Sequence, residues 1–137
     1  MVIGYTTGVF DLFHHGHVNL LRNAKSLCDK LVVGVSTDDL VSYKNKKAVI
    51  PFDERIEVVR SCRYVDCAVP QINMDKVQAF QKIKFDIMFV GDDWYSTDKW
   101  DDIEKRLENL GVNVVYFPYT QGTSSTLINA TLNTLRA

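Results

Sequence analysis

The chain has 137 residues, of which 46% are hydrophobic and 24% charged, and its formal net charge is −1 at pH 7. This composition predicts one globular domain over residues 1–137 and excludes both a disordered chain and the basic field typical of nucleic-acid-binding proteins. No apolar run approaches the ~20 residues that span a bilayer, and no basic leader opens the chain, so we expect a cytoplasmic protein without a membrane partner. The three cysteines form no CxxC pair, which argues against a zinc site.

Short apolar runs alternate with amphipathic stretches along the whole chain. The first run, at residues 2–6, predicts a strand, and the stretch at 16–28 predicts a helix. Further strands are expected at residues 31–35, 64–69, 87–90 and 112–117. Further helices are expected at residues 38–40, 53–62, 75–83, 98–110 and 124–135. Residues 45–50 show no helical period and predict a loop. Pro70 is expected to stop the third strand, and Gly111 is expected to cap the fifth helix.

This alternation predicts an α/β fold with a single, doubly wound, five-stranded parallel sheet of the Rossmann-like kind. The run at residues 31–35 is apolar throughout, as expected of a strand that is buried on both faces. Ligands of such sheets bind at the carboxyl ends of the strands, where the strand order reverses. We therefore expect the loops after the first, second, fourth and fifth strands to hold the functional residues.

The loop after the first strand contains all three histidines of the chain. His14 and His17 are three positions apart, so one helical turn places them on the same side, and Gly16 between them allows a ligand to approach the backbone. The unpaired N–H groups of a helix start favour an anion. This constellation predicts a phosphate-binding site. The alternatives are a capped helix start with surface histidines and, with no third ligand at a suitable spacing, a metal site.

Three other loops carry residues suited to a nucleotide. Lys44 and Lys46 follow the second strand and could close over phosphates, although a solvated charge run has the same pattern. Gly91-Asp92-Asp93 follows the fourth strand and could hold a ribose hydroxyl or a base amino group. The segment 122–126 follows the fifth strand and offers hydroxyls that either cap a helix or bind phosphate.

The run His14-His15-Gly16-His17 resembles the HxGH signature of the nucleotidyltransferase superfamily. Within that superfamily the chain is similar to the glycerol-3-phosphate cytidylyltransferases, because further segments occur in the order expected of them. These segments are Ser36-Thr37-Asp38, Lys44-Asn45-Lys46-Lys47, Glu54-Arg55, Arg63-Tyr64-Val65-Asp66, Gly91-Asp92-Asp93-Trp94 and residues 120–126. The resemblance covers nearly the whole chain and implies a nucleotidyltransferase fold.

The resemblance implies a cytidylyltransferase that transfers CMP from CTP to glycerol 3-phosphate, releasing CDP-glycerol and pyrophosphate for the synthesis of a teichoic-acid or capsular polymer. It further implies Mg²⁺ bound with CTP, no metal held by the protein alone, and a homodimer. The catalytic residues that it implies are His14, His17, Lys44 and Lys46. The implied nucleotide-binding residues are Val9, Phe10, Asp11, Gly16, Gly91, Asp92, Asp93, Tyr119, Gly122, Ser124 and Ser125. The residues expected to bind the acceptor phosphate are Lys44, Arg55 and Arg63.

Two positions depart from the family pattern. Tyr119 stands where an arginine is expected to hold phosphate, and a phenol brings no positive charge. Val9 stands where threonine is common and therefore lacks the hydroxyl. Alternatives with the same chemistry remain, namely another phosphorylated polyol or phosphoamine, or ATP in place of CTP. An alternative of another class is a non-catalytic nucleotide-sensing βα domain.

Overall fold

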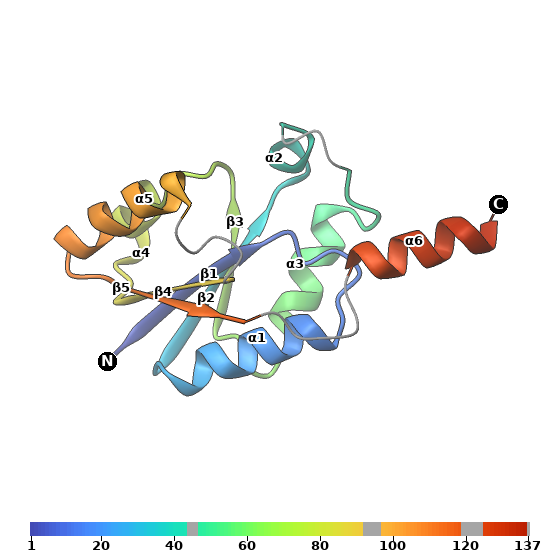
Figure 1. Ribbon diagram of the computed structural model, residues 1–137. Helices are drawn as coiled ribbons and strands as arrows, with labels where there is room; N and C mark the ends of the chain where they lie inside the picture. The colour runs from blue at the N-terminus through green and yellow to red at the C-terminus, as the bar shows by residue number, and fades with distance from the viewer. Residues whose placement is uncertain (44–46, 92–96, 119–124, 137) are drawn as a thin grey trace.

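The computed structural model of the chain describes residues 1–43, 47–91, 97–118 and 125–136. Strands and helices alternate along it (Figure 1). The strands are β1 (Ile3–Gly8), β2 (Lys30–Ser36), β3 (Cys67–Gln71), β4 (Ile87–Gly91) and β5 (Asn113–Phe117). The helices are α1 (His15–Ser26), α2 (Asp38–Tyr43), α3 (Phe52–Ser61), α4 (Lys76–Ile83), α5 (Asp98–Asn109) and α6 (Ser125–Arg136).

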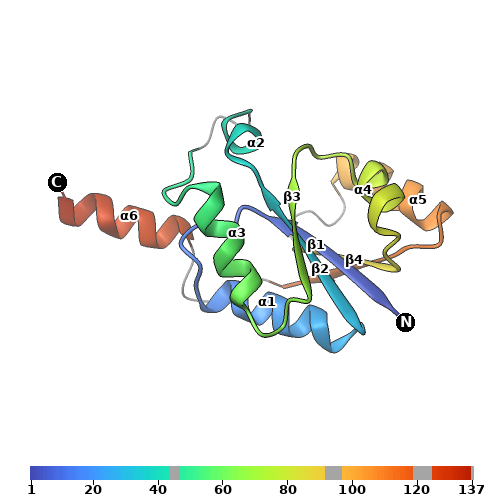
Figure 2. The ribbon, with the colours of Figure 1, turned by 180° about the vertical axis from the view of Figure 1, so that it is seen from behind.

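The strands form one five-stranded sheet in the order β3-β2-β1-β4-β5, and each neighbouring pair is parallel. Helices α1 and α3 lie on one face, and α4 and α5 lie on the other, as the two opposite views show (Figures 1 and 2). The predicted doubly wound parallel sheet is therefore confirmed. The strand order reverses between β1 and β4, which makes the carboxyl ends of these two strands the expected ligand position.

Side chains of strand β2 pack into two hydrophobic cores, one on each face of the sheet. Leu31, Val33 and Val35 belong to the core that also contains Leu21 of α1, whereas Val32 belongs to the core on the other face. All of these side chains are at most 5% exposed. Both faces of the strand are thus covered, which explains its uninterrupted apolar sequence.

The third strand differs from the prediction, which placed it at residues 64–69 and ended it at Pro70. The structure has the strand at Cys67–Gln71, with Pro70 inside it and paired with Val35. Strand β3 lies at the edge of the sheet, where a proline without an N–H group removes no hydrogen bond between two strands. As a result, Gln71 lies beside Ser36 at the carboxyl edge of the sheet. The Ser36 hydroxyl donates a hydrogen bond to Gln71 Oε1 over 3.1 Å.

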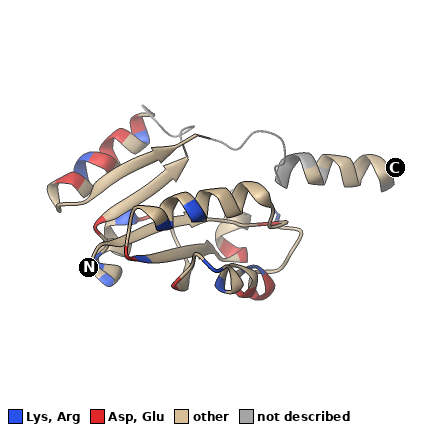
Figure 3. Cartoon of the chain, turned by 90° about the horizontal axis from the view of Figure 1, so that it is seen from below, with Lys and Arg blue, Asp and Glu red and all other residues tan. Residues whose placement is uncertain are grey.

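The helix ends follow local capping rules, and the helices differ in charge. Gly111 follows α5 with φ of 86°, which confirms its predicted capping conformation, and Thr37 Oγ1 accepts the Leu40 N–H at the start of α2. Acidic side chains are concentrated on α5, whereas the described part of α6 shows no acidic group (Figure 3). Among the described helices, none is long and apolar enough to cross a bilayer.

Candidate functional site

The loop that leaves β1 is held in an unusual backbone conformation by a buried aromatic residue. Phe10 and Leu12 have φ of 55° and 50°, in the left-handed region that side chains usually avoid at a cost of about 1–3 kcal/mol. Phe10 is only 4% exposed, and its ring centroid lies 5.3 Å from that of His17. Burial of Phe10 thus stabilises the turn that delivers the histidines to the start of α1.

The two histidines of the motif form a reciprocal cap at the start of α1. His14 is the residue before the helix, and its Nδ1 accepts the Gly16 N–H over 3.0 Å. His17 Nδ1 accepts the backbone N–H of His14 over 3.2 Å, and the two rings lie 4.0 Å apart between centroids. Because both Nδ1 atoms accept, the proton of each neutral imidazole belongs on Nε2. Each ring can therefore offer an Nε2–H donor to a ligand.

Burial keeps both imidazoles uncharged at neutral pH. It lowers the pKa of His17 to about 4, and the neighbouring His14 lowers it further, against the opposing effect of Asp11. Burial also lowers the pKa of His14, with a smaller contribution from His15. The pair can therefore provide hydrogen bonds without carrying a positive charge at neutral pH.

Asp11 connects the histidine loop to the segment that follows α2. Its Oδ2 accepts the Val49 N–H over 2.8 Å and its Oδ1 accepts the Ile50 N–H over 2.9 Å. Val49 and Ile50 come shortly after Lys44 and Lys46, so Asp11 ties the end of the lysine segment to the turn before the histidines. Asp11 thus contributes to the site by holding two segments of the chain together.

Arg55 braces the carboxyl ends of the first two strands from within. It is 1% exposed, and its Nη1 donates to the carbonyls of Val9 and Ser36 over 2.7 and 2.8 Å. Its Nε donates to the carbonyl of Ile50 over 2.8 Å, and its Nη2 donates to Asp38 Oδ1 over 2.7 Å. Four of the five guanidinium donors are thus used by three loops that converge on this side chain. Its predicted contact with the acceptor phosphate stays a prediction.

Asp38 is held as a carboxylate by the same arrangement. The backbone N–H of Phe52 and the guanidinium of Arg55 lower the pKa of Asp38, the former contributing more. The ion pair joins α2 to the start of α3, with Arg55 buried and the Asp38 side chain about half exposed. It therefore stabilises the approach of the second loop to the first.

Of the remaining predicted residues, the structure describes Arg63, Gly91 and Ser125, and the others lie outside the described part of the chain. Arg63 is exposed between the end of α3 and the start of β3, at the amino edge of the sheet, so one chain does not bring it to the histidines. Gly91 ends β4 next to β1, and Ser125 is the first residue of α6. The predicted site residues outside the described part of the chain are Lys44, Lys46, Asp92, Asp93, Tyr119, Gly122 and Ser124.

A cavity of about 160 Å³ lies at the reversal of strand order. Its polar lining comes from the ends of β1, β2 and β3 and from the start of α4. Lys76 is 3% exposed there, and its Nζ donates to Thr7 Oγ1 over 3.0 Å. The sequence did not predict Lys76 as a residue of the site, because the third strand was expected to end at Pro70 and no functional residue was expected in the loop after it. A lysine shortly after a strand, at a helix start, is the signal that could have found it.

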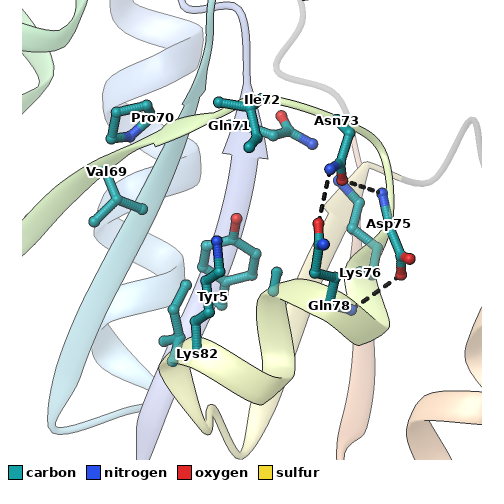
Figure 4. Close-up of a pocket in the computed structure, with 12 residues that line it drawn as sticks. Tyr5, Val69, Pro70, Gln71, Ile72, Asn73, Asp75, Lys76, Gln78 and Lys82 are labelled. Carbon is teal, nitrogen blue, oxygen red and sulfur yellow. Dashed lines mark hydrogen bonds between the residues drawn. The ribbon is translucent and has the colours of Figure 1, made fainter.

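A second, larger hollow adjoins this cavity between the edge strand β3 and α4. It has a volume of about 480 Å³, and Gln71 and Lys76 line both hollows (Figure 4). Tyr5 lies at its base, and burial raises the pKa of this phenol to about 12. Asp75 caps α4 by accepting the Gln78 N–H over 3.0 Å. The start of α4 is thus fixed in place between the two hollows.

Metal ligands are not gathered in the described ranges. There, no group of three or more His, Cys, Asp or Glu side chains is placed to hold an ion.

The chain is similar to several known proteins. The cytidylyltransferase-like family model matches residues 5–131. The glycerol-3-phosphate cytidylyltransferase of Bacillus subtilis is 40% identical over 124 residues, which are 90% of this chain and 91% of that protein. The FAD synthase of Archaeoglobus fulgidus is 37% identical over 109 residues, covering 80% and 79% respectively. Among solved structures, a lipopolysaccharide core biosynthesis protein from Thermoplasma volcanium matches with a TM-score of 0.74 and 27% identity, covering 90% of this chain and 99% of that chain.

Proposed function

The chain belongs to the cytidylyltransferase-like family, and from that premise we propose that it transfers CMP from CTP to glycerol 3-phosphate. The products are CDP-glycerol and pyrophosphate, and CDP-glycerol would supply glycerol phosphate units to a teichoic-acid or capsular polymer. The observation that carries the proposal is the pair of neutral imidazoles at the start of α1, at the strand whose carboxyl end borders the reversal of strand order. Support for the acceptor comes from relatives of that activity that match this chain over nearly their full length.

The reaction needs no covalent enzyme intermediate. A phosphate oxygen of glycerol 3-phosphate attacks the α-phosphorus of CTP, and the bond from that phosphorus to the bridging oxygen breaks as pyrophosphate leaves. Nε2–H donors of His14 and His17 bind phosphate oxygens as negative charge develops. Such transfers depend mainly on positioning and on charge neutralisation. When bound with CTP, Mg²⁺ supplies positive charge to the triphosphate oxygens.

The remaining parts of the site are proposed by resemblance. Lys44 and Lys46 would close over the triphosphate, and Asp11 and Arg55 position that segment through Val49 and Ile50. Further nucleotide contacts would come from Gly91, Asp92, Asp93, Tyr119, Gly122, Ser124 and Ser125. We also propose a cytoplasmic location, where CTP is available.

We further propose a homodimer, with residues 63–66 near the contact between protomers. Arg63 would then meet an acceptor only across that contact, since in its own chain it lies at the opposite edge of the sheet from His14. Light scattering at micromolar concentration is expected to give twice the mass of the chain, and a monomer would contradict this arrangement.

A second candidate function is the transfer of AMP from ATP to FMN. The observation that favours it is the similarity to archaeal FAD synthases, at 34–38% identity over 108–119 residues. Both reactions join a nucleotide to a phosphate monoester, so they share the histidine chemistry and differ in the base and in the size of the acceptor.

A panel of pyrophosphate-release assays separates these functions. Each of CTP, ATP, GTP and UTP is combined with glycerol 3-phosphate, FMN and a phosphoamine such as phosphocholine, with Mg²⁺ present. We expect release with CTP and glycerol 3-phosphate at least tenfold faster than with any other pair. Release only with ATP and FMN would replace the proposed function by FAD synthesis, and no release with any pair would favour a nucleotide sensor.

A further inference from the structure

A tyrosine hydroxyl faces the larger hollow, between the edge strand β3 and helix α4. Tyr5 of β1 is 2% exposed and lines this hollow, with its hydroxyl directed toward the loop after β3 (Figure 4). Within the described part of the chain, no group forms a hydrogen bond with the Tyr5 oxygen, whereas every fully enclosed side-chain polar atom there has a partner. We propose that the hollow binds a small organic anion with a flat apolar body, whose anionic group accepts hydrogen bonds from the Tyr5 hydroxyl and the Gln71 amide.

Gly34 of β2 leaves the space that the Tyr5 hydroxyl occupies. A Cβ at Gly34 would lie 2.5 Å from the Tyr5 oxygen, which is closer than side-chain atoms approach. The ring of Tyr5 is held by Phe85, on which it stacks with 4.9 Å between the ring centroids. The hydroxyl is therefore fixed in place before a ligand arrives, which reduces the conformational entropy lost on binding.

Two buried polar groups of the hollow can donate hydrogen bonds to a ligand. Burial raises the pKa of Tyr5 to about 12, so the phenol keeps its proton at neutral pH. Gln71 is also buried, and its Oε1 accepts from the Ser36 hydroxyl, while its Nε2 reaches only the weak acceptor Met74 Sδ over 3.6 Å. A primary amide has two N–H groups, so one is left for a ligand. A ligand that brings oxygen acceptors would satisfy both groups.

The charged residues around the hollow favour an anion. Lys76 and Lys82 line it from α4, and Asp75 is the acidic residue of its described lining. The carboxylate of Asp75 already caps α4, where its Oδ1 accepts the Gln78 N–H over 3.0 Å. Lys82 is exposed in the last turn of the helix, so its ammonium group is available at the rim. This positive balance favours an anionic ligand over a cationic one.

Apolar side chains form much of the remaining wall. Val69 and Ile72 come from β3 and the loop after it, and Ala79 and Ile83 come from α4. The volume of about 480 Å³ lies within the ~300–1,000 Å³ typical of small-molecule sites, which combine apolar walls with a few polar groups. A flat apolar body in the hollow would remove these walls from water. An aromatic carboxylate therefore has the required chemistry.

This site is separate from the one that carries the proposed function. The histidine pair belongs to α1, which covers the opposite face of the sheet from α4 (Figures 1 and 2). Gln71 and Lys76 line both the hollow and the cavity at the strand ends, whereas Tyr5 and Lys82 line only the hollow. Binding in the hollow can thus be measured without turnover, and its failure would leave the proposed function untouched.

Heteronuclear NMR of the full chain tests the ligand chemistry with three probes. These are naphthalene-2-carboxylate, the neutral naphthalene-2-carboxamide and acetate. We expect the aromatic carboxylate to bind with a Kd below about 1 mM, to shift the side-chain amide signals of Gln71, and to bind at least about tenfold more tightly than the carboxamide. Acetate, which lacks the apolar body, should not bind measurably. Equal affinity for the carboxylate and the carboxamide, or unchanged Gln71 signals, would overturn the proposal.

Tyr5→Phe tests the hydroxyl, because it keeps the ring stacked on Phe85. Its urea midpoint should be no lower than that of the unaltered protein, since no hydrogen bond to a described residue is lost, while Kd for the aromatic carboxylate should rise about tenfold. Lys82→Met, at an exposed position, should raise this Kd about threefold. The matched control Tyr43→Phe removes the hydroxyl of an exposed tyrosine on α2 and should leave Kd within about twofold.

Three results would contradict the site. An unchanged Kd in Tyr5→Phe would show that the hydroxyl contacts no ligand. A marked loss of stability in Tyr5→Phe would assign the hydroxyl a structural role instead. Displacement of the aromatic carboxylate by CTP or glycerol 3-phosphate would make the hollow part of the reaction site.

Discussion

Lowering the pH from 7 to 4 should weaken the fold by roughly 3 kcal/mol through His17 alone. An unfolded imidazole titrates near 6.5, whereas burial lowers the pKa of His17 in the folded protein to about 4. Between these values the unfolded chain binds a proton that the folded chain does not, so stability falls as the pH falls through 6.5. The loss levels off below about pH 4, where both states are protonated. Since one pKa unit corresponds to about 1.4 kcal/mol, the gap amounts to roughly 3 kcal/mol.

The variant His17→Gln isolates this contribution. A glutamine at the third helical position can accept the N–H of His14 as His17 does, so it preserves the cap without a titrating ring. Urea unfolding followed by circular dichroism at pH 7, 6, 5 and 4 gives the free energy of unfolding of both proteins. The unaltered protein should lose roughly 3 kcal/mol more than His17→Gln over this range. Parallel curves, or a His17 resonance that titrates near 6.5 by NMR, would refute the burial argument.

Two further substitutions test the roles of the site residues. His14→Ala is expected to lower kcat in a pyrophosphate-release assay by about 10²–10³-fold, as for other lost transition-state donors. The control His15→Ala changes an exposed histidine and should retain activity within about threefold. Comparable rates for the two variants would contradict the role assigned to His14. Arg55→Met is expected to lower the free energy of unfolding by about 3–5 kcal/mol, because it leaves three carbonyls and Asp38 without their buried partner. The control Arg106→Met changes an exposed arginine and should alter the free energy of unfolding by no more than about 0.5 kcal/mol. Equal urea midpoints for the two arginine variants would show that Arg55 is not a structural brace.

Local patterns were sufficient for the main features of the fold. The apolar run at residues 31–35 predicted a strand covered on both faces, and the structure divides its side chains between two cores. The histidines were predicted to lie together at the start of the first helix, and they do so because each caps the backbone next to the other. In both cases the information lies within a few neighbouring residues.

Features that depend on distant segments were not predictable in this way. Pro70 was expected to end a strand, and only the position of β3 at the sheet edge makes proline acceptable inside it. The burial of Arg55 depends on carbonyls from three separate loops, so its neighbours in the chain offered no sign of it. The same limitation hid Lys76, whose partner Thr7 is 69 positions away in the chain.

The central claim is that this chain joins CMP to a small phosphate monoester. The most direct test is ³¹P NMR of the purified protein with CTP, glycerol 3-phosphate and Mg²⁺. We predict that the CTP and glycerol 3-phosphate signals decline together, while pyrophosphate and a pair of coupled diphosphate signals from CDP-glycerol grow in equal amounts. An unchanged glycerol 3-phosphate signal, with CTP either intact or hydrolysed to CDP and inorganic phosphate, would contradict the claim.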